Sequence, residues 1–220
     1  MRGSQVNKLA EIEYPSSDGK PMAETDLHRD WMYTVIKRLE RFFASQRVYV
    51  SGNLLIYYQE GDPRKCIAPD AFVVKNCKPG RRETFLIWRE GRIPNFVLET
   101  TSKKTRREDK GKKTTIYAQL GVPEYFLYDP RGDWLKPSLQ GYQLVNGVYE
   151  PIPAENGGSI ASRELGIGFA LEEGALAMFD AQTGERLLSQ EERASVLEEE
   201  LARLRAASKK ANGERRKNGK

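Results

Sequence analysis

Two acidic residues stand at the ends of apolar runs that are typical of buried strands. Asp70 precedes the run at 71–74 ("AFVV"), and Glu99 follows the run at 96–98 ("FVL"). A carboxylate at the rim of a buried strand costs free energy unless a positive charge meets it. Two such acids on neighbouring strands can share a hard divalent cation, and the backbone carbonyl of Thr100 could supply a third oxygen ligand. A cation held there can lower the pKa of a bound water molecule and offset charge on a phosphate.

A second group of polar residues recurs at a spacing of four. Asp109, Lys113 and Tyr117 share one face of a helix that the sequence predicts over 105–120. If that face packs against the strand that ends at Glu99, the ammonium group of Lys113 can point into the carboxylates. The strand would then deliver an acid to a metal ion, and the lysine would neutralise charge that develops on a phosphate.

Positive charge follows Glu99 directly along the chain. The segment 103–113 ("KKTRREDKGKK") contains seven Lys/Arg and two acids. Such a run is often only a solvated helix face, but its position beside Glu99 favours contacts with phosphates. The expected nucleic-acid contacts are Lys103, Lys104, Arg106, Arg107 and Lys110.

These positions depend on a predicted alternation of helices and strands. Apolar residues at helical spacing predict a helix over 24–43, and Gly121 suits the end of the helix over 105–120. Extended segments are expected over 47–58 (interrupted at Ser51-Gly52), 68–75, 84–88, 95–101, 123–130, 141–152 (a hairpin turning at Asn146-Gly147) and, as short pieces, 165–188. This order predicts an α/β fold with a mixed β-sheet core flanked by helices, added β-hairpins and a C-terminal helical extension.

Changes in composition divide the chain into four parts. Residues 1–19 are polar and turn-rich and are interpreted as an N-terminal arm, and 20–186 are expected to form the single folded domain. A stripe of apolar residues among charges predicts a charged helix or short coiled coil over 187–208. The last part, 209–220, is expected to be a disordered basic tail.

The net charge of +5 belongs to that tail. Residues 209–220 contain six Lys/Arg and one Glu, so they carry +5 and the other 208 residues are neutral overall. No apolar run approaches the roughly 20 residues that span a bilayer, and the first residues lack the apolar core of a secretion signal. Cys66 and Cys77 show no CxxC spacing and are expected to be reduced. We therefore expect a cytoplasmic protein with no membrane association.

Several classes of site are unsupported by the sequence. His28 is the one histidine of the chain, which argues against sites that need several histidines. The phosphate-binding patterns GxxxxGK[ST] and GxGxxG do not occur, and neither does the GxSxG of nucleophile-elbow hydrolases. The acids near the strand ends remain as the candidate site.

Residues 69–130 resemble a known family. The run "PDAFVV", the strand "PNFVLETTSKK", the helix pattern D-x-x-x-K-x-x-x-Y and the run "GVPEYFLYDP" are together similar to the Uma-type (Uma-two) restriction-endonuclease-like family. That family belongs to the PD-(D/E)xK nuclease superfamily. The resemblance implies a restriction-endonuclease-like domain over 20–186, and it extends more loosely to "DGKPMAETDLH" and to the charged C-terminal helix.

The resemblance implies roles for individual residues. Asp70 and Glu99 take the positions of the metal-binding acids, Lys113 that of the catalytic lysine, and Glu24 that of a possible further acid. Thr101 stands where the superfamily usually carries its lysine, two residues after the acid, so the lysine is expected to be displaced onto the following helix. Possible neighbours of the site are His28, Thr101, Asp109 and Tyr117.

Each candidate also has a purely structural interpretation, which the sequence leaves open. The alternatives are a turn cap for Asp70, an ion pair with Lys103 or Arg106 for Glu99, a favourable charge in the first helical turn for Glu24, a solvated position for Lys113 and core packing for Tyr117.

The sequence and the resemblance together predict a metal-dependent endonuclease that uses Mg²⁺ or Mn²⁺ to hydrolyse phosphodiester bonds, with DNA as the expected substrate. A homodimer is expected, because the resemblance suggests one and the C-terminal helix has an apolar stripe to bury. The alternative is a nucleic-acid-binding or partner-binding module on the same fold that does not cleave. A third interpretation is a metal-dependent hydrolase of another phosphate ester.

Overall fold

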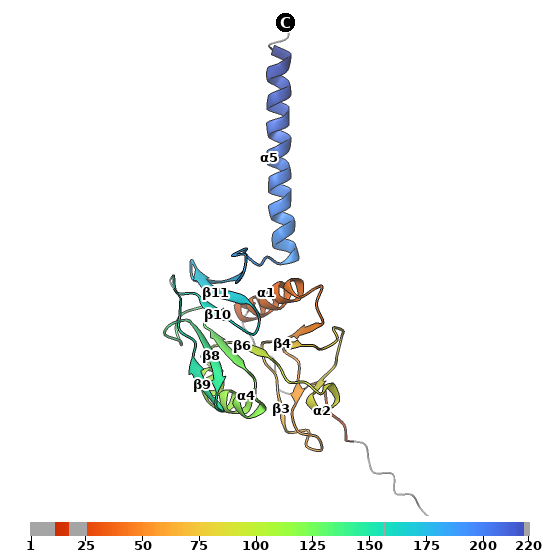
Figure 1. The fold of residues 1–220 in the computed structure, drawn as a ribbon, viewed down its shortest axis with the longest axis vertical. Helices are drawn as coiled ribbons and strands as arrows, with labels where there is room; N and C mark the ends of the chain where they lie inside the picture. The colour runs from red at the N-terminus through yellow and green to blue at the C-terminus, as the bar shows by residue number, and fades with distance from the viewer. Residues whose placement is uncertain (1–11, 18–25, 156, 218–220) are drawn as a thin grey trace, which may run out of the picture.

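A mixed six-stranded sheet forms the centre of the domain (Figure 1). The computed structural model describes residues 12–17, 26–155 and 157–217, with side chains described as far as residue 208. The strands, in spatial order, are β1 (Val48–Ser51), β4 (Ala71–Lys75), β6 (Phe96–Thr100), β7 (Glu124–Tyr128), β8 (Leu139–Val145) and β9 (Val148–Pro151). The β6–β7 pair is parallel and the other four pairs are antiparallel. The predicted α/β architecture with a mixed sheet is therefore confirmed.

Two three-stranded sheets and the helices complete the domain. One small sheet has the order β3 (Cys66–Ile67), β2 (Ile56–Tyr57) and β5 (Phe85–Leu86), and the other is β10 (Ile160–Ser162), β11 (Ile167–Glu172) and β12 (Ala175–Asp180). The helices are α1 (Asp26–Phe42), α2 (Ile87–Glu90), α3 (Arg106–Glu108), the π-helical turn η1 (Asp109–Lys113), α4 (Thr114–Leu120) and α5 (Gln190–Lys217).

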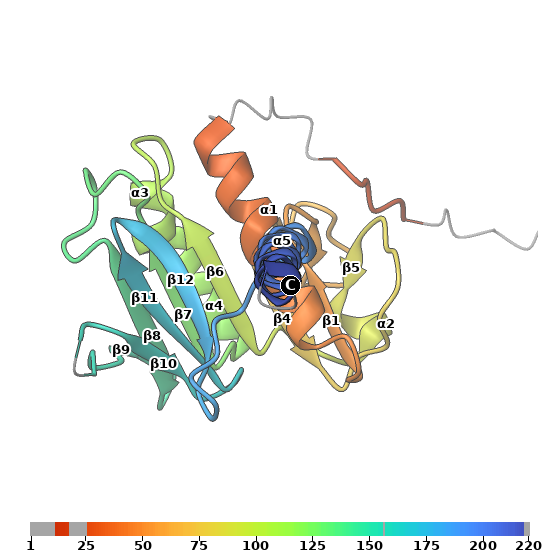
Figure 2. The same ribbon diagram turned by 90° about the horizontal axis from the view of Figure 1, so that it is seen from above.

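The central sheet is covered on both faces, which explains why its strands are continuous apolar runs. Successive side chains of a strand point to opposite faces. Phe96 and Leu98 therefore pack with α1 and the β10–β12 sheet, whereas Val97 packs with α4 and the β2–β3–β5 sheet. Figure 2 shows α1, β11 and β12 in front of the central sheet and α4 behind it. By the same alternation Glu99 lies on the α4 side.

The connection from β6 to β7 is one helical run with a π-helical turn in its middle. It comprises α3, η1 and α4 and occupies the predicted range 105–120. Gly121 ends it with φ +79°, in the left-handed region that favours glycine, and its N–H bonds to the Ala118 carbonyl at 3.0 Å. A crossover of this kind is what joins two parallel strands. The sequence did not predict the π-helical turn.

The C-terminal helix α5 projects away from the domain (Figure 1). Its start is fixed by reciprocal capping, because the Glu192 N–H bonds to Ser189 Oγ at 3.1 Å and the Ser189 N–H bonds to Glu192 Oε2 at 2.7 Å. The buried Arg38 of α1 anchors this turn through Glu192 Oε1 at 2.6 Å. The helix continues to Lys217, past the expected start of the basic tail at 209, because its Ala, Glu, Lys and Arg residues favour a helix.

Two other details differ from the sequence expectations. The segment 84–88 is extended only at β5, since Ile87–Glu90 forms α2 and Gly91 ends that helix with φ +62°. The short strands β3 and β10 were not predicted, because two or three residues are too few to show a period of two.

No disulfide joins Cys66 and Cys77. Within the described ranges, no helix is long and apolar enough to cross a bilayer.

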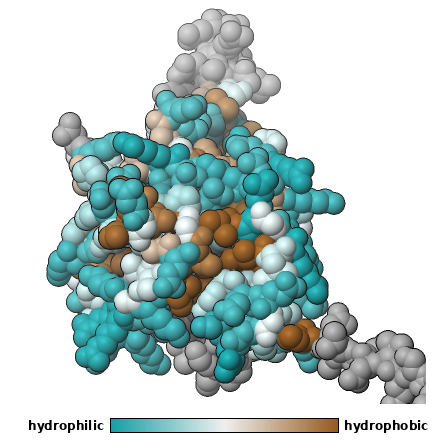
Figure 3. Space-filling view, turned by 60° about the horizontal axis from the view of Figure 1, so that its bottom comes forward, coloured by the Kyte–Doolittle hydropathy of each residue, from teal (hydrophilic) through white to brown (hydrophobic). Residues whose placement is uncertain are grey.

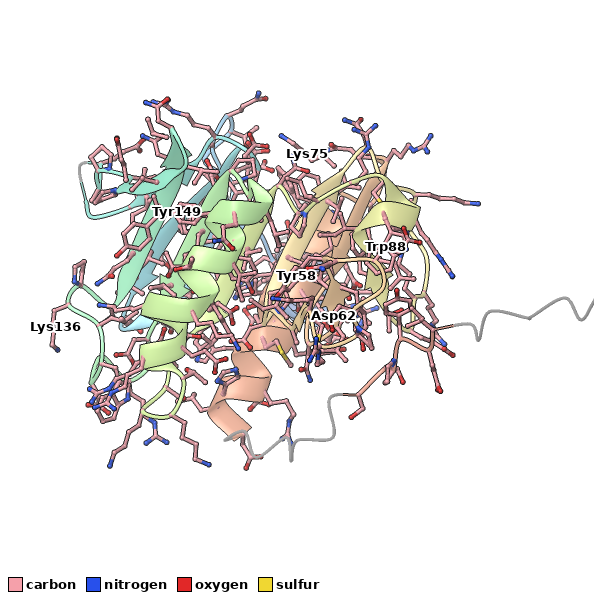
Figure 4. All side chains as sticks on the ribbon, turned by 90° about the horizontal axis from the view of Figure 1, so that it is seen from below. Tyr58, Asp62, Lys75, Trp88, Lys136 and Tyr149 are labelled. Atoms are coloured by element: carbon pink, nitrogen blue, oxygen red, sulfur yellow. The ribbon has the colours of Figure 1, made fainter. Side chains whose placement is uncertain are left out.

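Apolar residues gather on the lower face of the domain, inside a border of hydrophilic residues (Figure 3). Partly buried side chains next to the α4-side core include Leu54, Tyr58, Ile116 and Leu120. Figure 4, seen from below, places Tyr58 near the centre of this face and Tyr149 beside α4. The α4 side of the sheet is thus closed by apolar packing around the strand that carries Glu99.

Gly52 allows the end of β1 to lie directly against the backbone of Asp70. A Cβ atom at residue 52 would lie 1.9 Å from the Asp70 carbonyl oxygen and 2.6 Å from Ile36 Cδ1. The next residue, Asn53, donates its N–H to the Pro69 carbonyl at 2.8 Å. The position of Asp70 is therefore set by backbone contacts that only glycine permits.

We predict that Gly52→Ala destabilises the protein by about 1–3 kcal/mol, because the added methyl group must displace backbone and not a flexible side chain. Gly111→Ala is the matched control, since a Cβ atom there meets nothing within 4 Å. The control should change stability by no more than about 1 kcal/mol, in the stabilising direction. Urea unfolding measures both, and a Gly52→Ala protein as stable as the wild type contradicts the prediction.

Candidate active site

The antiparallel pairing of β4 and β6 brings Asp70 and Glu99 together. Ala71 pairs with Leu98, so the residues just beyond, Asp70 and Glu99, are neighbours on the α4 side of the sheet. The Thr100 N–H donates to Asp70 Oδ2 at 2.6 Å, and the Asp70 N–H lies 3.4 Å from Glu99 Oε2. The two carboxylates therefore share one edge of the sheet, as the sequence predicted.

Glu99 is buried and has two partners on the helical crossover. Its side chain is 1% exposed. Lys113 Nζ lies 2.7 Å from Glu99 Oε2, and the Tyr117 hydroxyl donates to Glu99 Oε1 at 2.7 Å. Tyr117 also packs its ring against Tyr125, with centroids 5.2 Å apart, so it is a core residue and a hydrogen-bond donor at once. The helix face predicted from the four-residue spacing does meet the strand end.

Burial dominates the electrostatics of Glu99. It raises the pKa of the Glu99 carboxyl to about 8, although the Lys113 ammonium opposes this and the carboxylates of Asp70 and Asp109 add to it. Burial alone would lower the pKa of Lys113, but the carboxylates of Glu99, Asp109 and Asp70 outweigh burial and raise it above its ordinary value. Lys113 is therefore an ammonium ion at neutral pH.

Asp109 adds a third acid to the cluster. Its side chain is 1% exposed, and Lys113 Nζ lies 3.3 Å from Oδ1. Burial raises the pKa of this carboxyl, and the Lys113 ammonium and a hydrogen bond with Thr105 oppose the shift. The backbone carbonyl of Asp109 accepts bonds from the Thr114 hydroxyl at 2.6 Å and the Tyr125 hydroxyl at 2.9 Å. The π-helical turn is thus fixed at its start.

The remaining predicted neighbours lie at the same edge. His28 Nε2 of α1 is 3.0 Å from Asp70 Oδ2. Thr101 is buried and donates its N–H to the Tyr128 carbonyl at 2.7 Å. Glu24 lies outside the described residues. The ion pair of Glu99 with Lys103 or Arg106, left open by the sequence, is replaced by the pair with Lys113, whose side chain is 13% exposed and not a solvated surface lysine.

The expected nucleic-acid contacts surround this buried cluster. Lys103, Lys104, Arg107 and Lys110 are exposed. Arg106 is half-buried, and its guanidinium lies over the ring of Trp134 with 5.0 Å to the ring centroid. The sequence analysis did not single out Trp134, whose signal was a lone aromatic residue in the turn-rich segment "DPRGDWLKP".

The donor set of the cluster fits a hard divalent cation. Glu99 and Asp109 both contact the Lys113 ammonium, and Asp70 adjoins Glu99, so three acids lie close to one ammonium ion. The N–H of Thr100 points toward Asp70. Because the N–H and C=O of one strand residue point to the same side, the Thr100 carbonyl also faces Asp70. No three His, Cys, Asp or Glu side chains among the described residues form a complete metal centre. Mg²⁺ typically uses only one or two carboxylates and keeps several waters.

The pKa of Glu99 predicts a pH-dependent difference between the wild type and Glu99→Gln without added metal. The folded state binds the Glu99 proton more tightly than the unfolded state, in which the pKa of this carboxyl is near 4.5. The stability that the protonated carboxyl contributes is complete below pH 4.5 and is lost as the pH rises through about 8. Between these values, the stability of Glu99→Gln relative to the wild type should rise by up to about 1.4 kcal/mol per pH unit.

Urea unfolding in EDTA at several pH values measures this difference. The comparison isolates Glu99, because Asp109 titrates in both proteins. If the stabilities of the two proteins change in parallel from pH 5 to 8, Lys113 holds Glu99 ionised throughout this range. The pKa of Glu99 is then not raised in the folded state.

The chain matches the family model "Uma2: Putative restriction endonuclease" over residues 5–178. No curated protein matches it. Among solved structures it is similar to the crystal structure of a "putative nuclease belonging to DUF820" from Anabaena variabilis, with 17% sequence identity, a TM-score of 0.48 and coverage of 72% of this chain and 87% of that chain. The family match includes the whole segment that carries Asp70, Glu99 and Lys113. The protein therefore belongs to the Uma2 family of restriction-endonuclease-like proteins.

Proposed function

We propose that the protein is a metal-dependent endonuclease that hydrolyses phosphodiester bonds, with DNA as the preferred substrate. The observation that carries this proposal is the buried carboxylate of Glu99 beside Asp70, with the Lys113 ammonium 2.7 Å from Glu99 Oε2. Membership in a family of restriction-endonuclease-like proteins supports a nuclease. Burial of Glu99 and Asp109 beside the partly buried Asp70 costs more stability than packing needs, so a catalytic role explains why these acids are there.

Asp70 and Glu99 would hold the Mg²⁺ or Mn²⁺ ion, with the Thr100 carbonyl as a third oxygen. When bound, such an ion would lower the pKa of a water molecule and offset negative charge on the phosphate. His28 would orient Asp70, because its Nε2 already lies 3.0 Å from Asp70 Oδ2. Tyr117 would orient the Glu99 carboxylate by donating its hydroxyl to Oε1.

Lys113 would act as a fixed positive charge and hydrogen-bond donor, not as a general base. Its raised pKa keeps it protonated at neutral pH, so it cannot accept a proton from an attacking water molecule. An ammonium ion in a water-poor site stabilises charge that develops on a phosphoryl oxygen.

A non-cleaving nucleic-acid-binding module is the second candidate. It is favoured by Thr101, which is buried where the superfamily usually carries its lysine. The exposed Lys103, Lys104, Arg107 and Lys110 serve phosphate contacts equally well with or without cleavage. Cleavage itself must decide between the two functions.

We predict that Lys113→Ala lowers the rate of cleavage by about 10²-fold or more, the effect of losing one charge-stabilising group. Lys110→Ala and Lys112→Ala are the matched controls, because both side chains are exposed on the same helical run. The controls should lose a little affinity and no rate. The assay is nicking of supercoiled plasmid with Mg²⁺ or Mn²⁺, and EDTA should abolish nicking by the wild type.

Binding measurements complete this test. Asp70→Ala should lose Mn²⁺ binding by calorimetry, whereas Lys113→Ala should keep it and should bind DNA in Ca²⁺ as the wild type does. A wild type that binds DNA but nicks with neither metal supports the non-cleaving module. Three lysine variants that behave alike would make Lys113 an ordinary member of the basic segment.

We also propose a homodimer that forms through α5. Four apolar side chains of this projecting helix are 47–62% exposed: Val196, Leu197, Leu201 and Leu204. The spacing of Leu197, Leu201 and Leu204 is the four–three spacing of a coiled-coil seam. A second copy of the same helix would bury this stripe.

We predict that the double change Leu197→Glu and Leu201→Glu halves the sedimenting mass, because four acids would meet at the seam. Glu199→Gln and Arg203→Gln, on exposed positions of α5, should leave the mass unchanged. A wild type that sediments as a monomer at micromolar concentration would exclude this interface.

A further inference from the structure

The loop after β7 leaves the sheet at the same edge as the candidate active site. β6 and β7 are parallel, and Glu99 pairs with Leu127 and Thr100 with Tyr128. The chain segments that follow both strands therefore begin side by side. Figure 2 shows the green loop after β7 next to the turn that leads into α3. Trp134 lies on this loop.

The loop is held in one conformation by the carboxylate of Asp129. This side chain is buried and accepts four backbone N–H bonds, from Arg131 at 3.1 Å, Gly132 at 3.0 Å, Trp134 at 2.5 Å and Leu135 at 2.9 Å. Leu135 is itself fully buried in the core on the α4 side. The backbone of Trp134 is thus fixed on both sides.

Trp134 differs from the other two tryptophans of the chain. Trp31 packs against Tyr128 with ring centroids 5.4 Å apart, and Trp88 packs against Tyr14 at 5.1 Å. Trp134 is only partly buried, and among the described residues it belongs to no core cluster and meets no other aromatic ring. An indole fixed on a rigid loop outside the core is a planar apolar surface of the kind on which nucleic-acid bases stack.

Arg106 links this ring to the helical run that carries Lys113. Its guanidinium lies over the Trp134 ring with 5.0 Å to the centroid. Arg106 precedes Asp109 by three residues and Lys113 by seven, so the pair lies about 10 Å along the helical run from Lys113. That separation is the length of about three stacked nucleotides. The exposed residues around it include Lys103, Lys104, Arg107, Arg131 and Lys136, opposed by Glu108 and Asp133, and Figure 4 places Lys136 at the outer end of the loop.

We propose that Trp134 and Arg106 form a stacking subsite for an unpaired base, and that the substrate carries single-stranded nucleic acid next to the scissile phosphate. This inference deepens the proposed nuclease function and rests on it. In a duplex both faces of a base are covered by its neighbours, so an aromatic platform is useful only for a base that has left the stack. Stacking of one base on an aromatic ring strengthens binding by roughly 5- to 150-fold and tolerates any sequence, because every base has a π face.

The test compares three fluorescein-labelled probes that bind the full chain in Ca²⁺: a twelve-residue oligothymidylate, an oligonucleotide of the same length and charge made of abasic sites, and a twelve-base-pair duplex. The wild type should bind the oligothymidylate at least about fivefold more tightly than the abasic strand. Trp134→Ala should abolish that preference and leave affinity for the abasic strand and the duplex unchanged.

Two further variants exclude a purely structural role of the pair. Trp134→Phe keeps an aromatic face, so it should retain part of the preference but lose the quenching of tryptophan fluorescence that oligothymidylate causes in the wild type. Arg131→Ala, on the same loop, should weaken binding of the oligothymidylate and abasic strands by equal factors, since it removes an exposed charge. A melting temperature for each variant checks that its fold is intact.

The outcomes separate this subsite from the nuclease function. Equal affinity of the wild type for the thymidylate and abasic strands, or equal weakening of both by Trp134→Ala, overturns the subsite even if the protein cleaves plasmid. A thymidylate preference that depends on Trp134 in a protein that never cleaves supports the subsite and overturns the nuclease function.

Discussion

The contact between Lys113 and Glu99 is the interaction on which the rest of the site depends. Glu99 is buried at the end of a central strand, where an isolated carboxylate would be costly. Lys113 reaches it from the crossover helix at 2.7 Å, and Tyr117 satisfies the other oxygen. Because β6 carries the acid and the following helix carries its partners, the pairing also fixes how the helix lies on the sheet.

Lys113 alone does not balance the charge of the cluster. Burial raises the pKa of Glu99 most, and the carboxylates of Asp70 and Asp109 add to the shift. A fold under selection for stability alone would replace such a group with apolar residues. A bound cation would offset the negative charge that Lys113 leaves uncompensated. The carboxylates that raise the electrostatic cost of the fold are therefore the same ones that the proposed chemistry uses.

The sequence was sufficient to predict the parts of this arrangement that follow from periodicity. A strand alternates and a helix repeats, so the apolar runs indicate which side of β6 carries Glu99, and the four-residue spacing indicates which face carries Lys113 and Tyr117. The π-helical turn, the two-residue strands and the loop of Trp134 were beyond such reasoning. They depend on tertiary contacts, such as the Tyr125 hydroxyl on the Asp109 carbonyl, that leave no periodic trace.

Lys113 brings its positive charge to the end of β6 from the helical crossover and not from the strand itself. A lysine at residue 101 would stand on the same side of the sheet as Glu99, because strand side chains alternate with a period of two. The Thr101 side chain carries no charge and is too short to take the place of a lysine. Its backbone N–H donates to the Tyr128 carbonyl. Lys113 instead arrives from the helix, where the π-helical turn and the bonds to the Asp109 carbonyl set its direction. The ammonium position therefore depends on the helix and not on the strand, so residues that hold η1 in place contribute to the site without touching a substrate.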